Sequence, residues 1–310
     1  MKAWYQRGNQ RRFHRVDMPV RLMILPDKRP VGKVLFHWGI NYFPPSVEVQ
    51  IRSCRQLLKT QISLIQENCE IVQTLFSEMM AQIEFLGELI QDISEGEHPL
   101  LKKENLQKFQ SHLQGFSLLV TIQQSSPKAY QLFKLIETKN LKILQAVRYF
   151  LQNSSSSQVK IYELTDFKID VAIEPYRALK YETIPLAHAA VLLTDFQNLY
   201  FQAWQEMMQD LQCQASPKTW PEYLVNVSTG GIAVLLPKSF PKFAHVCTRL
   251  YFPKIGVLEV KGSVVMQKSV PSEGKERIAV NFDMPTQELQ ISLRTQMELF
   301  ELKPAVEVFG

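Results

Sequence analysis

Three arginines stand close together near the start of the chain, in the segment QRRFHR, as Arg11, Arg12 and Arg15. A guanidinium group can hold two phosphate oxygens at once, can donate to O6 and N7 of a guanine, and can stack on a purine ring. The segment therefore has the chemistry to bind a phosphate or a purine base. The alternative is a solvated basic tail. The R-x-x-x-R spacing alone does not separate the two, because Arg7 and Arg11 form a second such pair.

A second group of candidate binding residues lies in the segment NVSTGG, as Asn226, Ser228, Gly230 and Gly231. The Asn226 side-chain oxygen can accept a hydrogen bond from a base N–H, and the Ser228 hydroxyl can bond to a phosphate or a base. The two glycines would let a ligand approach the backbone closely. The alternative is an ordinary polar turn inside a β-hairpin.

The sequence lacks the residue patterns that are typical of catalytic and metal-binding sites. The six histidines form no pair at metal-ligand spacing, and the four cysteines contain no C-x-x-C pair. Neither a glycine-rich phosphate loop nor a nucleophile elbow is present. We therefore expect a protein that is not an enzyme and that has neither a metal nor a cofactor.

The second group of candidate residues falls in a region with the pattern of antiparallel strands. From residue 220 onward, apolar segments alternate with Pro, Gly and polar turns, as YLVNVSTGGIAVLL, HVCTRLYF, GVLEVKGSVVMQ and RIAVNF. A helix over about 286–301 should follow Pro285. These strands predict a small barrel that needs one more strand to close, and residues 18–25, MPVRLMIL, are the candidate.

Taken together, the two motifs and the strands resemble the PilZ family, whose members bind the bacterial second messenger cyclic di-GMP. That family joins an arm bearing R-x-x-x-R, which leads into a first strand, to a (D/N)-x-S-x-x-G turn in the next strand pair. The matching residues are Arg11 and Arg15, with Arg12 as the frequent additional arginine, and Asn226, Ser228 and Gly231. The order of the later strands and the terminal helix also resembles the PilZ barrel, so the resemblance covers about 110 residues in two pieces.

The resemblance implies a non-catalytic receptor that binds cyclic di-GMP and relays its level to a protein partner. The implied ligand-binding residues are Arg11, Arg12, Arg15, Asn226, Ser228, Gly230 and Gly231. Outputs in this family commonly concern motility, pili or exopolysaccharide. Asn226 has one acceptor oxygen where an aspartate would have two, which predicts a weaker affinity.

The spacing of the motifs departs from the family, because about 210 residues separate Arg15 from Asn226. A large insertion in the first loop explains this spacing, since loop closure costs grow slowly with length. We expect an α+β protein in which residues 1–30 supply the arginine arm and first strand, and residues 218–310 supply the rest of the barrel. Residues 45–212 should form a mainly helical insertion.

The insertion begins with a regular heptad pattern over residues 46–95. Its main row is Ile51, Leu58, Ile65, Val72, Met79, Leu86 and Ile93, and its second row is Ile62, Cys69, Phe76, Ile83 and Ile90. This pattern predicts one continuous helix, about 75 Å long, in a coiled coil. Additional apolar residues favour a bundle of three or more helices, namely Leu57, Leu64, Ile71 and Phe85. We expect self-association into a homo-oligomer, with packing inside the chain as the alternative.

The rest of the insertion should contain both helices and strands. Helices are predicted over about 102–123, 127–152 and 186–212, where apolar residues keep helical spacing. The serine-rich linker NSSSSQ precedes VKIYEL and FKIDVAI, which have the composition of strands.

The overall charge indicates which ligands the protein can bind, and the N-terminus and cysteines indicate its compartment. With 35 basic and 30 acidic residues and a pI near 8.9, the chain can accept an anionic ligand, but nucleic-acid binding ranks low. We expect neither a secretory signal nor a membrane-spanning segment, and the cysteines predict a reduced cytoplasmic protein. The main alternative function is an oligomeric scaffold whose PilZ-like barrel does not bind nucleotide.

Overall fold

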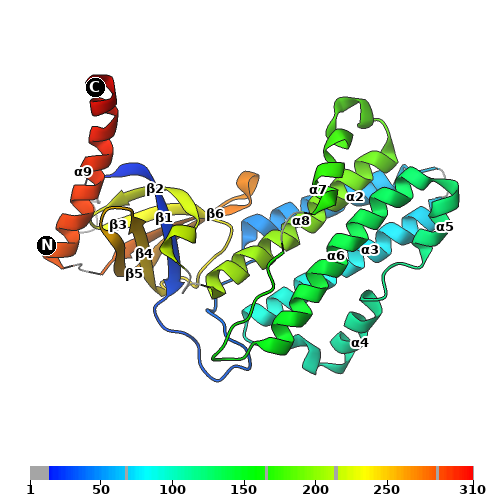
Figure 1. The fold of residues 1–310 in the computed structure, drawn as a ribbon, viewed down its shortest axis with the longest axis horizontal. Helices are drawn as coiled ribbons and strands as arrows, with labels where there is room; N and C mark the ends of the chain where they lie inside the picture. The colour runs from blue at the N-terminus through cyan, green and yellow to red at the C-terminus, as the bar shows by residue number, and fades with distance from the viewer. Residues whose placement is uncertain (1–13, 67–68, 165–166, 213–215, 284–285, 310) are drawn as a thin grey trace, which may run out of the picture. The chain divides into compact units, whose positions relative to one another are not determined.

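We describe the protein from a computed structural model that covers residues 14–66, 69–164, 167–212, 216–283 and 286–309 (Figure 1). The chain divides into two compact units. The barrel unit takes in the described residues of 1–29, 213–270 and 275–310, and the helical unit takes in those of 30–212 and 271–274.

The barrel unit is built on six antiparallel strands that close in the order β1-β2-β3-β6-β5-β4. The strands are β1 (Val16–Pro26), β2 (Glu222–Ser228), β3 (Gly231–Leu236), β4 (His245–Phe252), β5 (Gly256–Val270) and β6 (Lys275–Phe282). The expectation of a small antiparallel barrel interrupted by a helical insertion is confirmed. The segment YLVNVSTGGIAVLL supplies two strands, β2 and β3, with the candidate turn between them.

Strand β1 closes the barrel by pairing with a different strand along each half. Its first half pairs with β2, from Val16 opposite Val227 to Arg21 opposite Glu222, and its second half pairs with β4. Along the first half, Val16, Met18 and Val20 are buried while the residues between them are exposed. This alternation follows from the two-residue period of a strand, so Asp17 lies on the outer surface of the barrel.

Helix α9 (Gln287–Phe309) follows the last strand and packs on β1 and β2. Leu293 and Met297 are buried, whereas Ile291 and Leu302 are exposed. The helix therefore uses one apolar stripe against the barrel and leaves other apolar side chains in contact with solvent.

The helical unit is a bundle in which α8 contacts α2, α3 and α6 (Figure 1). Its helices are α2 (Pro45–Ser63), α3 (Cys69–Ser94), α4 (Lys103–His112), α5 (Leu118–Ser125), α6 (Pro127–Asn153), α7 (Lys168–Ala172) and α8 (Pro185–Leu211). Short 3₁₀ turns lie at Pro99–Leu101, Glu174–Arg177 and Leu179–Tyr181. Aromatic pairs join the helices, as where Phe76 meets Phe133 with ring centroids 5.2 Å apart. Among the described helices, none is both long and apolar enough to cross a membrane.

The prediction of one continuous helix over 46–95 was wrong. The chain forms α2 and α3, and it leaves the helical conformation after Ser63. The described members of the main heptad row, from Ile51 to Ile93, are all buried within this single chain. Because the break lets both helices pack against α8, the row is covered without a partner molecule. In the second row, the side chain of Cys69 lies outside the described part of the structure. Of the additional apolar residues, Leu57 and Leu64 are exposed.

The strands expected after the serine-rich linker were also wrong. Residues 159–164 form no regular element, and the FKIDVAI segment contains α7. Phe167, Ile169 and Ile173 are buried, but Val171 is 79% exposed. The alternation of residue types resembled a strand, whereas burial four residues apart is the period of a helix. The helix expected over 102–123 is likewise interrupted, between α4 and α5, where Gly115 has a φ of 77°.

Candidate functional site on the barrel

The two motifs identified in the sequence meet on the outer surface of the barrel. Nη1 of Arg15 donates a hydrogen bond to Oδ1 of Asn226 at 3.0 Å, although 211 residues separate them in the chain. The contact follows from the pairing of β1 with β2, which sets Val16 opposite Val227 and Asp17 opposite Asn226. Arg11 and Arg12 lie outside the described residues.

Asn226 is also held from its other side. Its Nδ2 donates to Oδ1 of Asp17 at 2.8 Å, so the amide lies between a guanidinium and a carboxylate. We call Arg15, Asn226 and Asp17 the barrel trio. Both hydrogen bonds are exposed to solvent, where a single polar contact contributes little to stability. The trio can therefore exchange its internal hydrogen bonds for bonds to a ligand at a small cost.

Ser228 has a structural part in the turn between β2 and β3. Its side chain is only 2% exposed, and Oγ donates to the Gly231 carbonyl at 3.2 Å and accepts from the Gly230 N–H at 3.4 Å. These bonds fix the shape of the turn. The hydroxyl contacts its own backbone instead of pointing outward as a ligand donor.

Gly231 is required by the close approach of strand β6. A Cβ atom at this position would clash with the carbonyl oxygen of Val280, which is backbone and cannot move aside easily. Gly230, the other glycine of the motif, accepts a hydrogen bond from the N–H of Phe282 through its carbonyl at 3.0 Å. The two glycines thus let the turn lie against β6, and they leave the surface beside Asn226 without bulky side chains.

The neighbouring strands β3 and β6 carry small residues beside Asn226. Ala233 lies opposite Asn226 on β3, and Ala279 lies opposite Ala233 on β6. Along β3 and β6 the intervening residues, Ile232, Val234, Ile278 and Val280, point into the core. Gly231, Ala233 and Ala279 therefore form a row of small residues, the small-residue shelf, of which Gly231 and Ala233 are buried and Ala279 is partly exposed. The shelf therefore places no bulky side chain beside Asn226 on β3 and β6.

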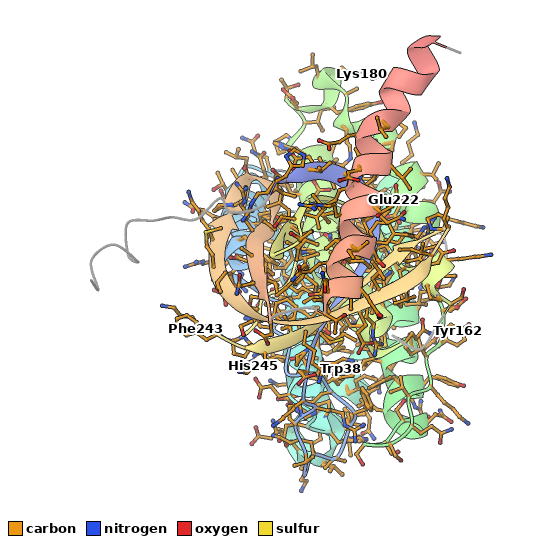
Figure 2. The ribbon with its side chains drawn as sticks, turned by 90° about the vertical axis from the view of Figure 1, so that its left-hand side faces the viewer. Trp38, Tyr162, Lys180, Glu222, Phe243 and His245 are labelled. Atoms are coloured by element: carbon orange, nitrogen blue, oxygen red, sulfur yellow. The ribbon has the colours of Figure 1, made fainter. Side chains whose placement is uncertain are left out.

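A polar row continues from the shelf across the sheet. The strand register leads from Gly231 to Asn281, then to Ser263, and then to His245 at the start of β4. Ser263 Oγ and His245 Nδ1 lie 3.3 Å apart. Close to His245 is Phe243, which is 64% exposed and has a φ of 63°, a conformation that is rare for an aromatic residue (Figure 2).

Sequence reasoning found Arg15 and Asn226 but missed Asp17, Ala233 and Ala279. Asp17 carries no motif, and its importance depends on which residue of β2 it faces. The alternation of β1 indicates that Asp17 points outward, but its partner is fixed by a strand pairing across the whole insertion. The alanines are recognisable only after the register of β2, β3 and β6 is known.

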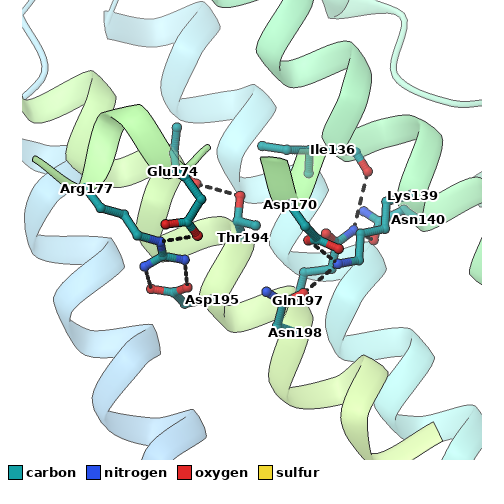
Figure 3. A network of polar contacts seen from close by, with 11 residues as sticks. Ile136, Lys139, Asn140, Asp170, Glu174, Arg177, Thr194, Asp195, Gln197 and Asn198 are labelled. Atoms are coloured by element: carbon teal, nitrogen blue, oxygen red, sulfur yellow. Dashed lines mark hydrogen bonds and ion pairs between the residues drawn. The ribbon is translucent and has the colours of Figure 1, made fainter. Parts of the chain in front are cut away.

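A second polar cluster lies in the helical unit around the buried side chain of Lys139 (Figure 3). Nζ of Lys139 on α6 donates to Oδ1 of Asp170 at 2.7 Å and to Oδ1 of Asn198 at 2.6 Å. The same ammonium lies 4.9 Å from the ring centroid of Phe167 and 5.3 Å from that of Phe201. We call Lys139, Asp170 and Asn198 the helical trio.

Burial controls the electrostatics of the helical trio. The Lys139 side chain is 1% exposed, and this burial lowers its pKa, while Asp170 partly opposes the shift by its hydrogen bond and charge. The trio borders a cavity of about 740 Å³. Because the lysine already donates to oxygens on α7 and α8, the trio ties three helices together, and this is a structural function.

Other groups in the described part of the chain give little sign of a catalytic or metal centre. Within that part, no cluster of three or more His, Cys, Asp or Glu side chains could hold a metal ion. Burial raises the pKa of the Cys54 thiol to about 12 and that of Cys247 to about 11. Such thiols are mostly protonated at neutral pH and are poor nucleophiles.

Comparison with known proteins provides no identification. Neither a protein-family model nor a curated protein matches the chain. Among solved structures, a periplasmic adaptor protein, EmrA, aligns over 91% of this chain and 96% of its own, at 11% identity and with a TM-score of 0.14. A similarity at this level carries no conclusion about fold or function.

Proposed function

We propose that the protein is a non-catalytic receptor for cyclic di-GMP that binds the nucleotide on the outer surface of its barrel. The observation that carries this proposal is the hydrogen bond between Arg15 and Asn226. It joins the R-x-x-x-R arm to the N-x-S-x-x-G turn, as a PilZ-type site requires, across an insertion that separates them in the sequence.

The chemistry of the site suits a cyclic dinucleotide. Asn226 Oδ1 can accept from the N1–H of a guanine, and Arg15 can turn from Asn226 to O6, N7 or a phosphate oxygen. The small-residue shelf keeps bulky side chains away from Asn226, so a base can approach the barrel trio. Arg11 and Arg12 would supply further positive charge for the two phosphates. A receptor for this messenger would act in the bacterial cytoplasm and pass the signal to a protein partner.

Isothermal titration with cyclic di-GMP tests the proposal. We expect saturable binding by the wild type, and loss of that binding in both Arg15→Ala and Asn226→Ala. The matched control is Arg294→Ala, which removes an exposed arginine of α9 and should leave the affinity unchanged. GMP and ATP should not compete. Absence of binding by the folded wild type would overturn the proposal.

A second candidate function is a scaffold whose barrel binds no nucleotide. The exposed apolar side chains of α9, Ile291, Leu299 and Leu302, favour a protein contact on this helix. The heptad row no longer supports self-association, because it is covered within the chain. Light scattering at several concentrations tests the proposed homo-oligomer, and a monomer throughout would remove it.

A further inference from the structure

We propose that Asp17 determines the base specificity of the nucleotide site by accepting a hydrogen bond from the exocyclic N2 amine of guanine. This inference rests on the proposed function, since it assigns a base contact within that site. It adds a residue that belongs to neither sequence motif.

The position of Asp17 is fixed by the strand pairing. Asp17 lies directly opposite Asn226, both side chains are on the outside of the barrel, and the two are joined by a hydrogen bond of 2.8 Å. A carboxylate has about four lone-pair positions, and the bond from Asn226 uses one of them. The carboxylate therefore keeps acceptor capacity next to the amide that is proposed to meet the base.

The order of groups along the barrel trio matches one edge of guanine. From Asp17 through Asn226 to Arg15, the side chains offer an acceptor, an acceptor and a donor. Guanine presents, in the same order, the N2 amine as a donor, the N1–H as a donor and O6 as an acceptor. Adenine has only a C–H at position 2, an acceptor at N1 and a donor amine in place of O6, so all three pairings would fail.

Asp17 also compensates for the weaker ligand affinity that is expected from an asparagine at position 226. A single amide oxygen can accept from only one of the two neighbouring guanine donors in good geometry. The adjacent carboxylate supplies the second acceptor, and its negative charge strengthens that bond. The same charge disfavours a phosphate beside Asp17, so the base lies at this end of the trio and the phosphates lie towards the arginines.

The test compares two ligands that differ at the proposed contact. Cyclic di-IMP has hypoxanthine bases, which keep N1–H and O6 but lack the N2 amine. We expect the wild type to bind cyclic di-GMP about 10- to 100-fold more tightly than cyclic di-IMP, the range of one good base contact. In Asp17→Ala the two ligands should bind with nearly equal affinity, because the partner of the N2 amine is gone.

Two further variants make the result unambiguous. Glu222→Ala removes another exposed carboxylate from the same face of β2 and should keep the wild-type preference for guanine. If Asp17→Ala folds poorly, Asp17→Thr takes its place in the test. Its side chain suits a strand but is too short to reach the base, so this variant should also bind the two ligands with nearly equal affinity.

The possible outcomes separate this inference from the proposed function. If the wild type binds cyclic di-GMP and the Asp17 variants keep the full preference over cyclic di-IMP, then Asp17 does not read the base and the receptor proposal stands. If the folded wild type binds neither nucleotide, both proposals are overturned.

Discussion

The two polar trios contain the same kinds of groups but lie in opposite surroundings. The barrel trio is Arg15, Asn226 and Asp17, and the helical trio is Lys139, Asn198 and Asp170. Each has one cation, one carboxylate and one amide, held by hydrogen bonds of 2.6–3.0 Å. The barrel trio is exposed, whereas the cation of the helical trio is 1% exposed.

This difference in exposure decides what each trio can do. Groups in water can leave one partner for another, because solvent satisfies them in between. A buried ammonium cannot change partners in this way, because a charge left unpaired in the protein interior is costly. The barrel trio is thus suited to bind and release a ligand, and the helical trio is suited to fix α6, α7 and α8 in one arrangement.

The largest expected effect comes from placing a charge where the helical unit is apolar. Met79 on α3 is fully buried, so Met79→Asp should lower the free energy of unfolding by about 4 kcal/mol. The control Leu224→Asp, at a residue of β2 that is 71% exposed, should change it by less than about 1 kcal/mol. Urea denaturation followed by circular dichroism measures both. A stable Met79→Asp protein that only changes its oligomeric state would mean that the heptad row faces another chain.

The next effect separates the two charges of the helical trio. Asp170→Ala leaves the Lys139 ammonium buried without its carboxylate and should cost about 2 kcal/mol, less than for a fully buried pair because Asp170 is 44% exposed. Lys139→Met removes the buried charge and fills its space, so it should cost less than about 1 kcal/mol. The same denaturation experiment ranks the variants. The reverse order would show that the lysine stabilises the bundle by its contacts with Phe167 and Phe201.

The pH dependence of stability offers a smaller signal from the same lysine. Burial lowers the pKa of Lys139 from its ordinary 10.5, so in alkaline solution the folded protein releases this proton before the unfolded chain does. The unfolded state then binds more protons, and stability rises with pH between the folded pKa and 10.5.

The matched measurement is the difference in unfolding free energy between the wild type and Lys139→Met as pH is raised. This difference isolates Lys139 from Cys54 and Tyr200, whose raised pKa values act in the opposite direction in the same range. We expect the wild type to gain stability relative to Lys139→Met. A constant difference would show that the lysine titrates normally in the folded protein.

The sequence predicted the barrel better than the helical unit, for a physical reason. In the first half of β1 and over residues 277–282 of β6, the alternation of residue types corresponds to the inside and outside of the barrel, because a strand has a period of two. Within the helical unit, the start of α8 was still predicted to within one residue, since Pro185 marks its first turn.

The break between α2 and α3 could not be predicted in the same way. Residues 64–68 contain neither glycine nor proline, and the heptad row continues through Ile65. The break depends on the packing of both helices against α8, which lies more than a hundred residues further along the chain. Asp17 was missed for a related reason, because its partner on β2 is known only once the barrel has closed.

The smallest expected effect on stability belongs to the barrel trio itself. Arg15→Ala and Asn226→Ala should each change the free energy of unfolding by less than about 0.5 kcal/mol, because their hydrogen bonds are exposed and water replaces the lost partner. Yet the same variants should lose cyclic di-GMP. Thermal unfolding without nucleotide measures the first effect, and unfolding at saturating nucleotide should raise the midpoint of the wild type alone. A large destabilisation without ligand would mean that the barrel trio holds the fold together, and its resemblance to the helical trio would then extend from composition to function.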